Sequence, residues 1–68
     1  MTKEKCHTYA QLGYCYRVAG SHQLSADYYL KMLQLAWDTN DNVKEIEAYM
    51  ELSTQYYYLG ELDKARYY

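Results

Sequence analysis

The chain has 68 residues, seven of them basic and nine acidic, and its formal net charge is −2 at pH 7. This length allows at most one small domain, and we expect neither a targeting peptide nor a membrane span. The charges are scattered, which argues against nucleic acid as a partner. Eleven tyrosines and no phenylalanine favour surfaces that are buried on one side and wet on the other, as at protein interfaces.

The sequence repeats itself after 40 positions. The stretch from Tyr9 to Gly20 returns as the stretch from Tyr49 to Gly60. The matching residues are Tyr9, Leu12, Tyr16 and Gly20 with Tyr49, Leu52, Tyr56 and Gly60, and the small residues Gly13 and Ser25 with Ser53 and Ala65. An internal repeat of this length indicates a stack of similar structural units.

The first expected helix covers residues 2–19, with Thr2 as its candidate N-cap. An i, i+3, i+4, i+7 spacing places four residues on one packing stripe, namely Tyr9, Leu12, Gly13 and Tyr16. Gly13 removes a side chain where a second helix would cross, and Gly20 ends the helix where a positive φ costs little. A helical hairpin is therefore expected.

The second expected helix covers residues 22–38, with Ser21 as its candidate N-cap. It carries two neighbouring apolar stripes, formed by Ser25, Tyr29, Met32, Leu33 and Ala36 and by Leu24, Tyr28 and Leu35. A helix with two apolar stripes packs against two neighbours, so we expect the stack to continue beyond the first hairpin.

Four small polar residues at 39–42 predict the turn between the repeats. Asn42 followed by Glu45 resembles a capping box and would open a third helix over residues 43–59. A fourth helix begins near Leu62, and about two turns of it precede Tyr68. Half of the second repeat's core is then missing, so we expect a piece of a longer protein or a piece held by neighbours.

These residues resemble the tetratricopeptide repeat (TPR) family, whose signature is an aromatic residue, Leu-Gly, Tyr and Gly, followed by Ala, an aromatic and another small residue. Tyr9, Leu12, Gly13, Tyr16, Gly20, Ser25 and Tyr29 fill the pattern, while Met32 and Trp37 replace an expected small residue and an expected proline. The period of 40 is similar to the extended subclass of the Leu-Gly-Asn repeat proteins. The resemblance implies an all-α fold of antiparallel helical hairpins stacked as an α-solenoid fragment, with repeat one over residues 2–38 and a truncated repeat two over residues 43–68.

The resemblance also implies a function. In this family the first helix of each hairpin lines a concave groove, which acts as a scaffold that binds a peptide or helix of a partner protein. The groove positions fall on His7, Ala10, Tyr14, Arg17 and Val18 in repeat one and on Glu47, Met50, Thr54, Tyr57 and Tyr58 in repeat two. The clamp of Lys and Asn that some members use for acidic carboxy-terminal peptides is absent, because Ala10 and Tyr14 occupy its first positions.

The groove candidates have structural alternatives. Tyr14, Tyr57 and Tyr58 would equally fill space between neighbouring helices, and Arg17 would equally be a solvated charge. A structural segment of a large cytoskeletal or ciliary assembly, held by neighbouring subunits, also fits the tyrosine content. That alternative predicts burial of outer residues such as Trp37 or Tyr67, and it rests on analogy with family members. Both interpretations place the chain in the cytoplasm.

Catalysis, a cofactor and a metal are not expected. The chain has no Ser-His-Asp order, no paired carboxylates in an apolar setting and no glycine-rich phosphate loop. Cys6 and Cys15 lie about 13 Å apart on opposite faces of one helix, so they cannot pair and are expected to be reduced, buried or half-buried thiols. His7 and His22 match no zinc-ligand spacing with these cysteines.

Overall fold

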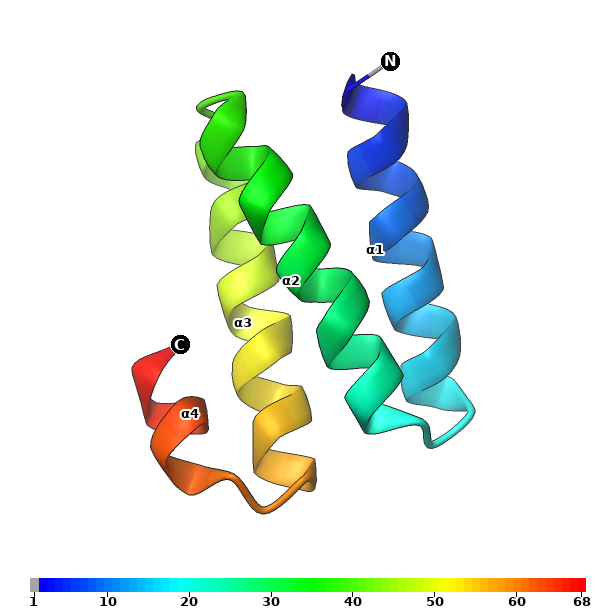
Figure 1. The fold of residues 1–68 in the computed structure, drawn as a ribbon, viewed down its shortest axis with the longest axis vertical. Helices are drawn as coiled ribbons and strands as arrows, with labels where there is room; N and C mark the ends of the chain where they lie inside the picture. The colour runs from blue at the N-terminus through cyan, green and yellow to red at the C-terminus, as the bar shows by residue number, and fades with distance from the viewer. Residues whose placement is uncertain (1) are drawn as a thin grey trace.

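Four α-helices make up the fold, as the computed structural model shows for residues 2–68, with side chains described from Glu4 onward. They are α1 (Thr2–Val18), α2 (His22–Asp38), α3 (Asn42–Tyr58) and α4 (Leu62–Tyr67). Each helix packs against the next and runs antiparallel to it (Figure 1). The expected all-α class is confirmed, and no β-strand occurs within residues 2–68.

The turns between the helices share one backbone geometry. Gly20 and Gly60 have φ angles of +84° and +77°, and Asn40, midway between them, has a φ of +56°. In each turn the next amide closes the helix by donating to a carbonyl five residues back, as Ser21 N does to Tyr16 O at 2.8 Å. The chain therefore turns every 20 residues, and Asn40 takes the place of a third glycine.

Three expectations about helix ends need correction. α1 ends at Val18 and not at residue 19, and α3 spans Asn42–Tyr58 and not residues 43–59. Asp41 caps α3, because its Oδ1 accepts a hydrogen bond from Lys44 N at 3.1 Å. The prediction of a capping box formed by Asn42 and Glu45 is therefore wrong. The side chain of Glu45 accepts a hydrogen bond from Trp37 Nε1 at 2.8 Å instead.

Thr2 and Ser21 are the N-caps predicted for α1 and α2, and the structure describes the side chain of Ser21 only. Ser21 does occupy the N-cap position of α2, but its side chain makes no capping hydrogen bond. The expected cap at Thr2 lies outside the described side chains. The start of α2 is therefore fixed by the preceding turn and by packing, without help from a side-chain cap.

The crossing of α1 and α2 lies at Gly13, as expected. A Cβ atom at this position would lie 2.7 Å from Cε2 and Cζ of Tyr29, a ring that is itself buried. Ser25 donates a hydrogen bond from Oγ to the carbonyl oxygen of Gly13 at 2.7 Å. Glycine at this position leaves the space that the Tyr29 ring occupies.

A cluster of tyrosine rings fills the other side of the first hairpin. The ring of Tyr28 stacks on the ring of Tyr16 at a centroid distance of 5.6 Å and lies 6.3 Å from the ring of Tyr9. The ammonium group of Lys31 covers the Tyr28 ring at 5.0 Å. Such ring pairs add to the stabilisation that comes from burial alone.

The second hairpin reproduces these contacts. Tyr68 stacks on Tyr56 at 5.6 Å and lies 6.0 Å from Tyr49, which are the positions 40 residues after those of the first cluster. The hydrogen bond between a serine hydroxyl and a backbone carbonyl also recurs, but the donor is now on the first helix of the hairpin. Ser53 Oγ donates to the carbonyl oxygen of Ala65 at 3.0 Å. The sequence repeat is therefore a repeat of contacts.

The core lies mainly between α2 and α3. Its buried members are Ala26, Tyr29, Met32, Leu33, Ala48, Leu52 and Tyr56. Equivalent positions of the two hairpins are not equally buried, because Leu52 is fully buried whereas Leu12 is only half-buried. α3 packs against both α2 and α4, while α1 packs mainly against α2, which explains the difference.

This asymmetry predicts unequal effects of one substitution at two equivalent positions. Leu52→Ala should lower the free energy of unfolding by about 2–5 kcal/mol through the cavity it leaves. Leu12→Ala should lower it clearly less, because solvent already reaches that side chain. Urea unfolding followed by circular dichroism measures both, and equal losses would contradict the burial pattern.

A second prediction concerns the crossing. Gly13→Ala should destabilise the chain by about 1–3 kcal/mol, because its Cβ overlaps the buried Tyr29 ring. The same change elsewhere in a helix normally stabilises by about 1 kcal/mol, so the sign is diagnostic. Cys15→Ala, at an exposed position on the same helix, is the control and should be nearly silent. A Gly13→Ala chain more stable than the parent would rule out the close crossing.

Candidate protein-binding surface

The ten predicted groove residues all lie on α1 and α3. The exposed ones are His7, Tyr14, Val18, Glu47, Met50, Tyr57 and Tyr58, and the half-buried ones are Ala10, Arg17 and Thr54. Tyr14 is 54% exposed, and Met50 and Tyr57 are each 66% exposed. Ala10 differs from the others because it packs against the core. Large apolar side chains are thus exposed on both helices.

Arg17 joins the two helices that carry these residues. Its Nη1 lies 3.6 Å from Oε2 of Glu51 on α3, and its guanidinium carbon lies 5.0 Å from the ring centroid of Tyr14. Oε2 of Glu51 is buried and accepts no hydrogen bond from the described residues, so Arg17 is its nearest counter-charge. Arg17 therefore links α1 to α3 through a partly exposed ion pair. The sequence pattern did not identify Glu51 as its partner.

A second set of contacts links the start of α2 to the end of α3. Nδ1 of His22 donates to Oε1 of the fully buried Gln55 at 2.7 Å. The His22 ring also stacks on the ring of Tyr58, with centroids 4.7 Å apart and planes 14° apart. One face of Tyr58 is thus covered by the chain itself, while 62% of the residue is exposed.

Two further polar side chains of the predicted groove, Thr54 and Glu47, have partners within the chain. Thr54 Oγ1 donates to the carbonyl oxygen of Met50 at 3.1 Å. Glu47 Oε2 lies 3.3 Å from Lys44 Nζ. The surface therefore offers exposed apolar groups and paired charges, and it has no cluster of one sign.

Burial controls the chemistry of the groups beneath this surface. Burial, together with the negative charge of Glu51, raises the pKa of Tyr29 to about 12, while the positive charge of Arg17 opposes this rise. Burial also raises the pKa of the Cys6 thiol, with a smaller contribution from Asp41. Cys15 is exposed, so the expectation of two buried or half-buried thiols holds only for Cys6.

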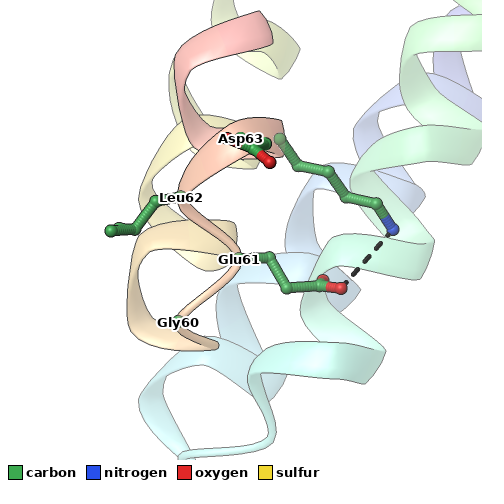
Figure 2. Close-up of a pocket in the computed structure, with 5 residues that line it drawn as sticks. Gly60, Glu61, Leu62 and Asp63 are labelled. Carbon is green, nitrogen blue, oxygen red and sulfur yellow. Dashed lines mark ion pairs between the residues drawn. The ribbon is translucent and has the colours of Figure 1, made fainter.

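One hollow of the surface lies beside α4. Figure 2 shows the hollow at the turn between α3 and α4, where Glu61 pairs with Lys64 at 3.7 Å and Leu62 points away from this pair. Within residues 2–68, no three His, Cys, Asp or Glu side chains are grouped so that they could hold a metal ion. Over the same residues, no helix is both long and apolar enough to cross a membrane.

The raised pKa of Tyr29 predicts a loss of stability at alkaline pH. The folded chain holds the proton of the Tyr29 hydroxyl more tightly than the unfolded chain does. The resulting contribution to the free energy of unfolding is therefore complete below the usual tyrosine pKa of about 10. It is lost as the pH rises through about 12. Tyr29→Phe should make the free energy of unfolding less dependent on pH above about 9. Part of the dependence should remain, because burial also raises the pKa of Tyr56.

Urea unfolding at a series of pH values measures this effect. The control is Tyr14→Phe, since Tyr14 is exposed and its substitution should leave the parent's pH profile unchanged. Identical profiles for Tyr29→Phe and the parent would show that Tyr29 is not buried as described.

Comparisons of the chain with protein families, with curated proteins and with solved structures find no match.

Proposed function

We propose that the surface of α1 and α3 binds a peptide or helix of a partner protein and that the chain is a non-catalytic scaffold module of the TPR type. The observation that carries this proposal is the exposure of three large apolar side chains, Tyr14, Met50 and Tyr57. They lie on two helices that the pair of Arg17 and Glu51 holds together. Large apolar side chains exposed on two helices are the kind of surface that a protein partner covers.

The residue types on this surface suit a protein ligand. Aromatic residues dominate the binding energy of many interfaces, and methionine adapts its shape to an irregular partner. Met50, Thr54 and Tyr57 follow an i, i+4, i+7 spacing, so they form a stripe about 10 Å long on α3. A stripe of this kind accommodates two or three side chains of a bound segment.

The charges of the surface indicate which partners it would favour. Arg17 and Glu51 form one pair and Lys44 and Glu47 another, so little unpaired charge is available to attract a strongly acidic or basic segment. A partner that contributes apolar anchors therefore fits better than an acidic carboxy-terminal tail.

A structural role in a large assembly is the second candidate. Trp37 is 48% exposed and Tyr67 is 78% exposed, and both lie outside the proposed binding surface. Neighbouring subunits of an assembly would bury such residues. A cytoskeletal or ciliary location within the cytoplasm belongs to this second candidate, by analogy with the family that the sequence resembles.

Peptides selected from a random display library against the chain would test the first candidate. Tyr14→Ala and Tyr57→Ala should each weaken a selected peptide's binding by about 1–2 kcal/mol, because each removes an aromatic anchor. Helicity should change little, since both side chains are exposed. Isothermal titration measures the affinities, and Trp37→Ala serves as the control with an exposed aromatic residue elsewhere.

The opposite pattern would favour the structural role. If the peptides bind Tyr14→Ala and Tyr57→Ala as tightly as the parent, while Trp37→Ala or Tyr67→Ala abolishes binding, the surface of α1 and α3 is not the interaction site.

A further inference from the structure

One face of α3 carries apolar side chains at the spacing of a coiled-coil seam. Its positions are separated alternately by three and four residues, and we call them the α3 seam: Val43, Ile46, Met50, Ser53 and Tyr57. The four large apolar members are between 59% and 73% exposed. A seam of this spacing is the surface that one helix presents to a second helix lying alongside it.

The equivalent stripe of α1 shows what such a face contacts in this molecule. Moved back by the repeat of 40 residues, the seam from Ile46 onward falls on Cys6, Ala10, Gly13 and Arg17. Gly13 meets the Tyr29 ring of α2, and Arg17 pairs with Glu51 of α3. Ala10 packs against the core, and Cys6 is only 3% exposed. Helices of the chain therefore cover this stripe of α1.

The α3 seam is covered at one point only by α4. This helix lies beside the C-terminal half of α3, where Ser53 Oγ donates to the carbonyl oxygen of Ala65 at 3.0 Å (Figure 1). Ile46, the equivalent of the buried Cys6, is 59% exposed. A helix placed on the seam would therefore continue the interface that α3 already forms with α4.

The backbone of α3 favours a helical partner over an extended one. In the interior of a helix, the amide and carbonyl groups are bonded to one another, so α3 offers an extended segment no backbone hydrogen bonds. An extended segment on the seam would lose water from its own backbone groups without replacing it. A helical partner avoids this cost, because its backbone groups are satisfied internally.

The seam also defines the side chains and the length of its partner. Val43 and Ile46 carry hydrocarbon side chains, so a charge placed against them would be buried without a counter-charge. From Val43 to Tyr57 the seam extends about 21 Å, or about four turns, at 1.5 Å per residue. An amphipathic helix of about four turns, with apolar residues at heptad spacing, fits this surface.

We propose that the α3 seam binds an amphipathic helix of a partner protein, side by side with α3. The inference rests on the proposed function, because Met50 and Tyr57 belong to both surfaces. It goes further by specifying a helix where the proposed function allows any peptide. Val43 and Ile46 are not among the ten predicted groove residues, so they test the seam separately.

Two display libraries of peptides of about 20 residues, a length that allows stable helices, provide the probes. One library has a helix-forming framework of Ala, Glu and Lys with randomised residues at the heptad a and d positions. The other carries prolines along the same framework, which prevent helix formation. Selection against the 68-residue chain should give binders from the helical library, and circular dichroism should show that their helicity rises on binding.

A charge on the seam should block these helical binders. Ile46→Lys should weaken their binding at least about tenfold, measured by isothermal titration, because the lysine faces apolar residues of the peptide. Leu24→Lys is the matched control, since Leu24 is 45% exposed on α2 and outside the seam. This control should keep the affinity within about twofold of the parent's. If Ile46→Lys is not helical by circular dichroism, Val43→Lys replaces it, at a position that is 73% exposed.

The results separate this inference from the proposed function. Helical binders that neither lysine variant weakens would place their site elsewhere and overturn the inference. Binders from the proline library alone, weakened by Tyr14→Ala or Tyr57→Ala, would also overturn it and leave the proposed peptide binding intact. The absence of binders from both libraries would contradict the inference and the proposed function together.

Discussion

The close crossing of α1 and α2 at Gly13 determines most of what lies around it. Because Gly13 has no side chain, the ring of Tyr29 reaches the backbone of α1 and Ser25 can donate to the Gly13 carbonyl. Tyr29 is then buried near Glu51, whose partner Arg17 comes from α1. The relative positions of α1 and α3, and with them the candidate binding surface, therefore depend on a missing side chain.

Repetition explains how so short a chain organises four helices. A left-handed residue recurs every 20 positions, at Gly20, Asn40 and Gly60, and each one is followed by a new helix. Each turn reverses the chain, so neighbouring helices are antiparallel (Figure 1). The same tyrosine positions therefore meet in both hairpins.

The sequence predicted the elements more accurately than their contacts. The two glycines and the repeat placed all four helices to within a residue, because positive φ angles and the packing stripe are local signals. The cap at Asp41 was missed since Asn42 offered an equally good local signal. The bond between His22 and Gln55 was missed because it joins residues 33 positions apart and leaves no periodic trace. The half-burial of Leu12 depends on how many helices surround α1, which the repeat alone does not reveal.

The central claim is that the second hairpin reproduces the contacts of the first. Nuclear Overhauser effects between aromatic protons in solution test it most directly. The account predicts contacts between the rings of Tyr16 and Tyr28 and matching contacts between the rings of Tyr56 and Tyr68, since both pairs have centroids 5.6 Å apart. Contacts in the first pair with none in the second would contradict it.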